Sequence, residues 1–289
     1  MNVERMSIIG AGTMGTGIAQ VAAQAGIEVT VIDTAASALD QSRRSLRRSL
    51  QDAVERGELA EQEAEEIRRL IDWSSEWDAV ANADWVLEAV FEDMPVKRRV
   101  LTRAGESAPD RAIISSNTSA LQIGALADAT GRPTRFIGMH FFNPPSTMKL
   151  VEIVPSDRTG KTIIQDAIEL ARRLGKQPAV APDIPGFFVN RGFGALLSAA
   201  IEIWLQGAAP EDIDTAMELG LAHQRGPLRT ADILGLDMCL ALLDSLHEQT
   251  GHARFEVAPE FREMVEGGKL GRKSGEGFYT WDGGGEAGD

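Results

Sequence analysis

A histidine and a glutamate could form an acid–base pair in HFFNPPSTMKLVEIV, which covers residues 140–154. His140 follows the apolar run RFIGM and Glu152 lies inside LVEIV, and both runs are typical of strands. If a hairpin joins these strands, the carboxylate lies beside the imidazole, where it can fix the tautomer and stabilise the charged ring. The alternative is an ordinary hairpin that carries two ionisable residues, and this stretch alone does not decide between the two.

Further polar residues lie where a reacting oxygen could be held. Ser119 closes the polar cluster SSNTS, and Asn190 opens a long apolar helix at VNR, where its amide could donate to a substrate oxygen. Ser119 could instead cap a helix at ALQIGAL, because a serine hydroxyl often accepts a hydrogen bond from the first helical turn. The late histidines, His247 and His252, are interpreted as surface or packing residues, and His223 could be either.

A glycine-rich turn predicts a dinucleotide site. SIIGAGTMGTGIAQ places Gly10, Gly12 and Gly15 in the G-x-G-x-x-G pattern between a strand and a helix. Glycines there allow a tight turn and a close approach of the backbone to a pyrophosphate at the helix N-terminus. The next strand, EVTVID, ends at Asp33, whose carboxylate would accept from a ribose 2′-hydroxyl and repel a 2′-phosphate. The pattern favours NAD over NADP, and a tight turn without a ligand is the alternative.

Hydride transfer to or from a nicotinamide leaves a proton for an acid–base group. His140 is the candidate because it lies at the carboxyl end of an expected strand, where open α/β sheets bind their ligands. Glu152 is its natural orienting partner. The sequence therefore predicts an oxidoreductase.

The elements that must position these residues alternate through about the first 180 residues, which predicts an α/β fold with a Rossmann-like, doubly wound, mostly parallel sheet. The apolar runs expected as strands are MSIIGAG, EVTVID, ADWVLEAV, AIISSN, RFIGMHFF and LVEIV. Helices are expected at 13–25, 35–56, 60–71, 96–107 and 159–174. Residues 35–71 are predicted to form a helical hairpin that is inserted between strands and projects from the sheet.

A change of pattern at AVAPDIPGFFVNR predicts a hinge. Beyond it, VNRGFGALLSAAIEIWL predicts a long apolar helix, which must be buried in its own domain or against a second subunit. Further helices are expected at about 210–219, 228–250 and 259–267. We expect an NAD-binding domain over 1–184 and a smaller all-α domain for substrate binding and dimerisation over 185–289. The tail WDGGGEAGD is expected to be disordered.

Composition bounds the class of protein. The 289 residues carry a net charge of −14, which argues against non-specific nucleic-acid binding. The chain shows no apolar run of membrane-spanning length and does not begin like a signal peptide, and its single cysteine suits a reducing compartment. We therefore expect a cytoplasmic protein that binds no membrane and no metal. The arginine-rich stretch RRSLRRSLQDAVER is either a solvated helix face or a site for a phosphate-rich ligand.

Taken together, the motifs resemble the L-3-hydroxyacyl-CoA dehydrogenase family, also called 3-hydroxybutyryl-CoA dehydrogenases. They follow in order along nearly the whole chain: GAGTMGTGIAQ, EAVFEDMPVK, SSNTSAL, GMHFFNPP, MKLVEIV, PGFFVNR, GPLRTADILGLD and GGKLGRKSGEGFY. The resemblance implies NAD-dependent interconversion of (S)-3-hydroxyacyl-CoA and 3-oxoacyl-CoA by a dyad of His140 and Glu152. It also implies that Ser119 and Asn190 contact the C3 oxygen, and that a homodimer forms through the all-α domain.

The resemblance implies ligand contacts as well. Those to NAD would come from Gly10, Gly12, Gly15, Asp33, Glu92, Lys97, Ser119, Asn143 and Lys273. The helical hairpin would hold coenzyme A, with Ser49 and Arg56 at the matching positions. Part of the charge of the arginine-rich helix would then face the nucleotide phosphates.

Departures from the family pattern leave the substrate open. Ser146 stands at the usual second proline of the NPxP motif, Gln224 and Arg225 replace Pro-Met, and Glu58 stands where many bacterial members have lysine. Glu58 would weaken the attraction for CoA phosphates, and Arg225 could favour a substrate with a second carboxylate or a polar acyl chain. The alternatives are a short hydroxyacyl group on an acyl carrier protein, or a free hydroxy acid. An inactive NAD-binding or structural protein is a further alternative, against which the intact site residues speak.

Overall fold

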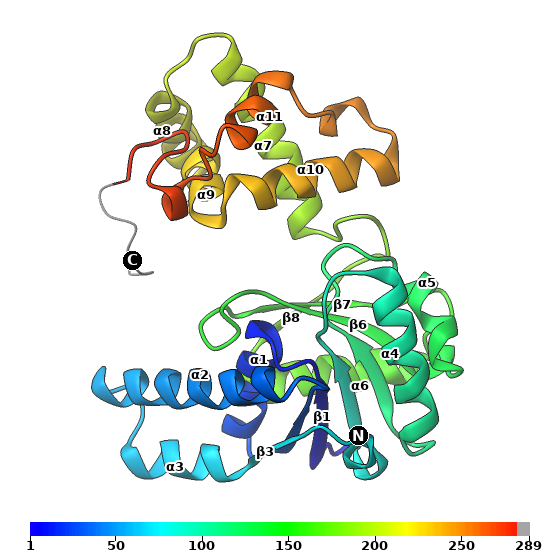
Figure 1. The fold of residues 1–289 in the computed structure, drawn as a ribbon. Helices are drawn as coiled ribbons and strands as arrows, with labels where there is room; N and C mark the ends of the chain where they lie inside the picture. Colours follow the sequence, from blue (N-terminus) through cyan, green and yellow to red (C-terminus); the bar gives the residue numbers. More distant parts are fainter. Residues whose placement is uncertain (282–289) are drawn as a thin grey trace. The chain divides into compact units, whose positions relative to one another are not determined.

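The computed structural model describes residues 1–281, so residues 282–289 of the predicted disordered tail lie outside the described residues. The chain divides into two compact units, Met1–Phe187 and a second that begins at Phe188 (Figure 1). No helix within residues 1–281 is both long and apolar enough to cross a membrane.

The first unit is built on one eight-stranded sheet with the order β3-β2-β1-β4-β5-β6-β7-β8. The strands are β1 Arg5–Ile9, β2 Glu28–Ile32, β3 Ile71–Ser74, β4 Trp85–Glu88, β5 Ile113–Ser116, β6 Phe136–Phe141, β7 Leu150–Val154 and β8 Gln177–Val180. β6 and β7 pair antiparallel, and the other neighbours pair in parallel. The predicted mostly parallel, Rossmann-like sheet is confirmed. The short outer strands β3 and β8 were not predicted.

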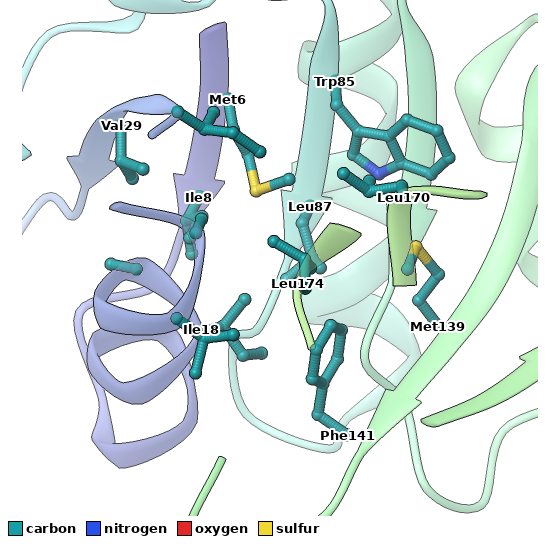
Figure 2. Close-up of a cluster of buried hydrophobic side chains, with 14 of the residues drawn as sticks. Met6, Ile8, Ile18, Val29, Trp85, Leu87, Met139, Phe141, Leu170 and Leu174 are labelled. Carbon is teal, nitrogen blue, oxygen red and sulfur yellow. The ribbon is translucent and has the colours of Figure 1, made fainter. Parts of the chain in front are cut away.

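Helices cover both faces of this sheet. They are α1 Thr13–Gln24, α2 Ala36–Glu55, α3 Glu61–Arg69, α4 Met94–Ser107, α5 Ile123–Ala127 and α6 Lys161–Arg173, with short 3-10 turns η1 Trp77–Asn82, η2 Asp128–Thr130 and η3 Pro133–Arg135. Successive strand residues point to opposite faces, so Ile8 enters one apolar core and Ile9 the other. Figure 2 shows the first core, in which Ile18 of α1 and Leu170 of α6 lie around the strand residues Ile8 and Leu87.

The helical hairpin α2–α3 packs its apolar side onto this first core. Leu39, Leu46 and Leu50 of α2 and Ile67 of α3 belong to the same buried cluster as Ile18. These leucines recur about one or two helical turns apart, which gives α2 a single apolar stripe and leaves its arginines on the solvent side. The hairpin therefore packs against α1, and it also contacts the sheet at β3, where the indole of Trp73 donates to Ser42 of α2 at 3.1 Å.

The second unit is all-helical in its described part, with α7 Val189–Leu205, α8 Pro210–Leu221, α9 Pro227–Leu234, α10 Leu236–Thr250 and α11 Pro259–Glu266, and 3-10 turns η4 Ala253–Phe255 and η5 Arg272–Ser274. The single helix predicted at about 228–250 is wrong: it is interrupted at Gly235, whose φ of 104° no helix accommodates. α7 buries Leu197 and Ile201 inside its own unit.

Candidate active site

His140 and Glu152 face each other across the antiparallel pair β6–β7. The register sets His140 opposite Glu152, which turns a separation of twelve residues into direct neighbours. The Nδ1 of His140 lies 2.7 Å from Oε2 of Glu152. The histidine is 6% exposed and the glutamate 0%. A carboxylate only accepts hydrogen bonds, so this contact places the proton of the neutral imidazole on Nδ1.

The other nitrogen of His140 is left for a ligand. Within residues 1–281, Nε2 makes no hydrogen bond to the protein. Two phenyl rings contact the imidazole, with centroid distances of 4.4 Å for Phe142 and 5.9 Å for Phe187. The arrangement is an oriented imidazole with one free edge, which suits the transfer of a proton.

The loop between the two strands packs on the first helix. A Cβ on Gly17 of α1 would come within 2.8 Å of the Pro145 ring, so this glycine is what lets the loop lie so close. Asn143 and Ser146 of the loop line a cavity of about 390 Å³ between α1 and α2, and Ser49 of α2 lines it too. The structure thus brings one predicted NAD contact, one predicted CoA contact and one departure from the family pattern to a single cavity.

Arg56, the other predicted CoA contact, does not line this cavity. Its guanidinium donates two hydrogen bonds to Glu58, from Nε at 2.8 Å and from a terminal nitrogen at 2.9 Å. Both side chains are more than half exposed, and the hydrogen bond to Arg56 lowers the pKa of the Glu58 carboxyl. Glu58 is therefore the present partner of the group predicted to hold phosphate.

The glycine loop has the shape that a dinucleotide needs. Gly10 has a φ of 113°, and a Cβ there would lie 2.5 Å from the carbonyl oxygen of Ala89. A Cβ on Gly15 would lie 1.9 Å from the oxygen of Gly10. Around Gly12, by contrast, a Cβ would meet nothing within 4 Å, and Gly12 lines a cavity of about 730 Å³. The first and third glycines close the turn, and the second leaves room for a phosphate.

Asp33 lines the same cavity and also braces the loop. Its Oδ2 accepts from the amide of Ala11 and its Oδ1 from the amide of Ala35, both at 2.9 Å. Each carboxylate oxygen has a second lone pair, so the group can still accept from a ribose hydroxyl.

Residues that the sequence reasoning missed complete this cavity. Phe91, Arg99 and Arg103 line it, and the Arg103 guanidinium lies 4.6 Å from the centroid of the Trp77 ring. Arg99 and Arg103 follow the FEDMPVK motif with a spacing of four residues, which puts them on one face of α4. That spacing was the available signal.

The buried Lys97 and the Glu92 side chain, which is 35% exposed, form an ion pair of 3.2 Å beside the polar cluster after β5. The amides of Ser119 and Ala120 donate to Oε1 of Glu92 at 2.8 and 2.9 Å, as does the hydroxyl of Thr118. Burial raises the pKa of Glu92, but the charge of Lys97 and these hydrogen bonds outweigh it and hold the pKa below its ordinary value. Glu92 is therefore an anion that fixes the backbone at Ser119.

The alternative role of Ser119 as a helix cap is wrong. The helix α5 begins at Ile123, and its first amides, of Ile123 and Gly124, donate to the carboxylate of Asp183 at 2.8 and 2.7 Å. Asp183 comes from the segment after β8, sixty residues away, so no local pattern signalled this cap.

Two predicted site residues belong to the second unit. Asn190 lies in the first turn of α7. Lys273 lies in η5, where its Nζ is 2.6 Å from both carboxylate oxygens of Asp237. The roles of both residues at the His140 site stay predictions.

Comparison with known proteins decides the family. A family model described as 3-hydroxyacyl-CoA dehydrogenase, NAD binding domain, matches residues 5–184, and the model of the C-terminal domain matches residues 186–281. The chain belongs to the 3-hydroxyacyl-CoA dehydrogenase family. It is an NAD-dependent dehydrogenase, and the predicted coenzyme is confirmed. Gly12, open to the large cavity, and Asp33 are residues that fit NAD.

Relatives match this dehydrogenase over nearly their whole length. A probable 3-hydroxybutyryl-CoA dehydrogenase of Deinococcus radiodurans is 41% identical over 278 residues, which are 96% of this chain and 100% of the relative. Another probable 3-hydroxybutyryl-CoA dehydrogenase, from Bacillus subtilis, is 38% identical over 98% of this chain and 99% of the relative. The crystal structure of (S)-3-hydroxybutyryl-CoA dehydrogenase from Ralstonia eutropha is similar with a TM-score of 0.93 and 36% identity, over 98% of this chain and 100% of that chain.

Proposed function

We propose that this dehydrogenase interconverts (S)-3-hydroxyacyl-CoA and 3-oxoacyl-CoA with His140 as the acid–base group. The observation that carries the proposal is the buried contact of 2.7 Å between Nδ1 of His140 and Oε2 of Glu152, which leaves Nε2 available. The relatives named as 3-hydroxybutyryl-CoA dehydrogenases support a short acyl chain and coenzyme A as the carrier.

NAD, when bound, supplies the hydride acceptor for the carbon that bears the hydroxyl group. In the oxidation, Nε2 of His140 accepts the proton of that hydroxyl, and Glu152 stabilises the resulting imidazolium through Nδ1. In the reduction the same nitrogen returns the proton to the C3 oxygen. General acid–base catalysis of this kind contributes about 10²–10⁴-fold to a rate.

Hydrogen-bond donors at the C3 oxygen complete the proposed site. Ser119 is proposed to donate through its hydroxyl, which donates to Oε1 of Glu92 at 3.4 Å in this structure, and its backbone is held in place by the same carboxylate. Asn190 is proposed to donate through its side-chain amide. Donors that are already oriented stabilise the charge that develops on an oxygen in the transition state.

Coenzyme contacts are proposed on the same basis. The residues are those of the glycine loop and its neighbours, Gly10, Gly12, Gly15 and Asp33, together with Glu92, Lys97, Asn143 and Lys273. Contacts at the loop are supported by the open space at Gly12 and by the position of Asp33 on the same cavity.

An acyl carrier protein as the carrier is favoured by one observation, the pairing of Arg56 with Glu58. The phosphates of coenzyme A would have to compete with Glu58 for the guanidinium. Solvent screens an exposed ion pair, however, so this competition weakens CoA binding only modestly. Ser49 remains available in the cavity beside Ser146. Coenzyme A is therefore the carrier that we propose.

Turnover with matched carriers tests this proposal. NADH consumption is followed with acetoacetyl-CoA, with acetoacetyl groups on an acyl carrier protein, and with free acetoacetate. We expect the highest kcat/KM with the CoA thioester. A chain that reduces only the carrier-protein substrate or only the free acid would contradict the choice of coenzyme A.

We further propose a homodimer formed through the second unit. Ile203 and Leu205, at the end of α7, are 39% and 40% exposed although both are large and apolar. Sedimentation equilibrium should give twice the mass of the chain, and a monomer at all concentrations would rule the dimer out.

A further inference from the structure

The last residue of the first unit contacts His140. The chain passes from the first unit to the second between Phe187 and Phe188. The ring centroid of Phe187 lies 5.9 Å from that of His140, and the ring planes are inclined at 58°. Phe187 is 1% exposed and belongs to the second core of the sheet, together with Val154 of β7.

Phe187 adopts a backbone conformation that side chains other than glycine rarely adopt. Its φ is 47°, and the preceding Gly186 has a φ of 77°. A bulky residue in this region costs conformational free energy and persists where its surroundings hold it there. A glycine at position 187 would avoid that cost, but it would also remove the ring from His140.

The segment that carries Phe187 is fixed at several points of the first unit. The amide of Ala181 donates to the oxygen of Ile153 at 2.9 Å, which continues the sheet beyond β8. The carboxylate of Asp183 accepts from the first two amides of α5. The amide of Phe187 donates to the oxygen of Ile184 at 3.0 Å. These contacts therefore fix the position of the segment that carries the Phe187 ring.

We propose that Phe187 is a positioning residue, which holds the imidazole of His140 so that Nδ1 stays on Glu152 and Nε2 is directed to the substrate. One hydrogen bond fixes one point of the ring and leaves rotation about it possible. Contacts on the ring from Phe142 and Phe187 remove that freedom. This proposal rests on the proposed role of His140.

The test compares Phe187→Leu with Phe136→Leu. Phe136 is 0% exposed, lies in the same core and is in the same strand as His140, so its variant controls for the loss of an aromatic ring from that core. We expect Phe187→Leu to lower kcat by about tenfold or more, because small misplacements of reacting groups are costly, with KM and the Kd for NAD unchanged. In Phe187→Leu, the isotope effect on kcat with substrate deuterated at C3 should differ from that of the wild type. Phe136→Leu should keep the wild-type kcat at a comparable loss of Tm.

A spectroscopic readout keeps this inference separate from the proposed function. The proton on Nδ1 of His140 should give a low-field NMR resonance in the wild type, assigned by its loss in His140→Gln. We expect it to be broadened or lost in Phe187→Leu and retained in Phe136→Leu. A Phe187→Leu variant with wild-type turnover and an unchanged resonance would overturn this inference and leave the proposed function in place. A wild type that is inactive, but whose resonance is lost in Phe187→Leu, would overturn only the proposed function. If Phe187→Leu does not fold, Phe187→Met takes its place.

Discussion

The first unit contains two buried pairs of charged or ionisable residues that differ in how many of their donors are used. Lys97 is 1% exposed, and its Nζ donates to Glu88 at 2.7 Å and to the oxygen of Val90 at 3.3 Å, with Glu92 at 3.2 Å. Two of the three ammonium donors are therefore hydrogen-bonded to the protein, and Glu92 adds an ion pair. His140 commits one nitrogen to Glu152 and keeps the other open. The pair of Lys97 and Glu88 is enclosed by protein groups and can hold the fold, whereas His140 has a nitrogen left to act on a ligand.

The largest effect that follows from this difference concerns Lys97. Lys97→Met should lower the free energy of unfolding by about 3–5 kcal/mol, because it leaves the carboxylate of Glu88 buried without its cation. Urea denaturation measures this loss. Arg98→Met is the matched control on the same helix, since Arg98 is exposed and its guanidinium donates to a carbonyl oxygen rather than to a carboxylate. Equal losses in the two variants would contradict the structural role of the pair of Lys97 and Glu88.

Removing the charge of Glu152 should lower the turnover rate, whereas the Lys97 substitution lowers stability. Glu152→Gln keeps the shape of the side chain but cannot stabilise an imidazolium as an anion does. Hydrogen bonds to charged groups are worth about 1.5–3 kcal/mol, so we expect kcat to fall by roughly 10- to 200-fold. The Kd for NAD should not change. Steady-state kinetics with a parallel binding titration separates the two quantities, and a variant with wild-type kcat would remove Glu152 from the mechanism.

The smallest effect is a dependence of stability on pH at Glu92. Its pKa is lower in the folded chain than the ordinary value of 4.5, so the carboxylate stabilises the fold above pH 4.5, and this contribution is lost as the pH falls further. The difference in unfolding free energy between the wild type and Glu92→Gln should therefore narrow as the pH is lowered below 4.5. Denaturation curves at several pH values measure it, and a constant difference would show that the carboxylate charge plays no part.

The two pairs also differ in how far the sequence predicts them. His140 and Glu152 lie in two apolar runs joined by a short loop, so a local hairpin brings them together. Lys97 and Glu88 are only nine residues apart, but their contact depends on how α4 packs back onto β4, which the strand and helix patterns do not specify. The glycine loop was predictable because the conformation of Gly10 and the contact at Gly15 exclude larger residues.

Other parts of the fold could not be predicted for related reasons. Only Ile71 is buried in the strand β3, and the helix predicted over 60–71 ends at that residue. The break at Gly235 depends on one glycine inside an otherwise continuous apolar pattern. The cap from Asp183 to α5 joins segments sixty residues apart. The limits in these three cases are the single buried residue of β3, the backbone conformation of one glycine, and a tertiary contact.

The most direct test of the central claim is the turnover of His140→Gln. We expect kcat with acetoacetyl-CoA and NADH to fall by about 10²–10⁴-fold, because glutamine can donate a hydrogen bond but cannot take up and return a proton at neutral pH. The Kd for NAD and the Tm should stay near those of the wild type. A folded, NAD-binding His140→Gln variant with undiminished kcat would contradict the assignment of His140 and Glu152 to catalysis.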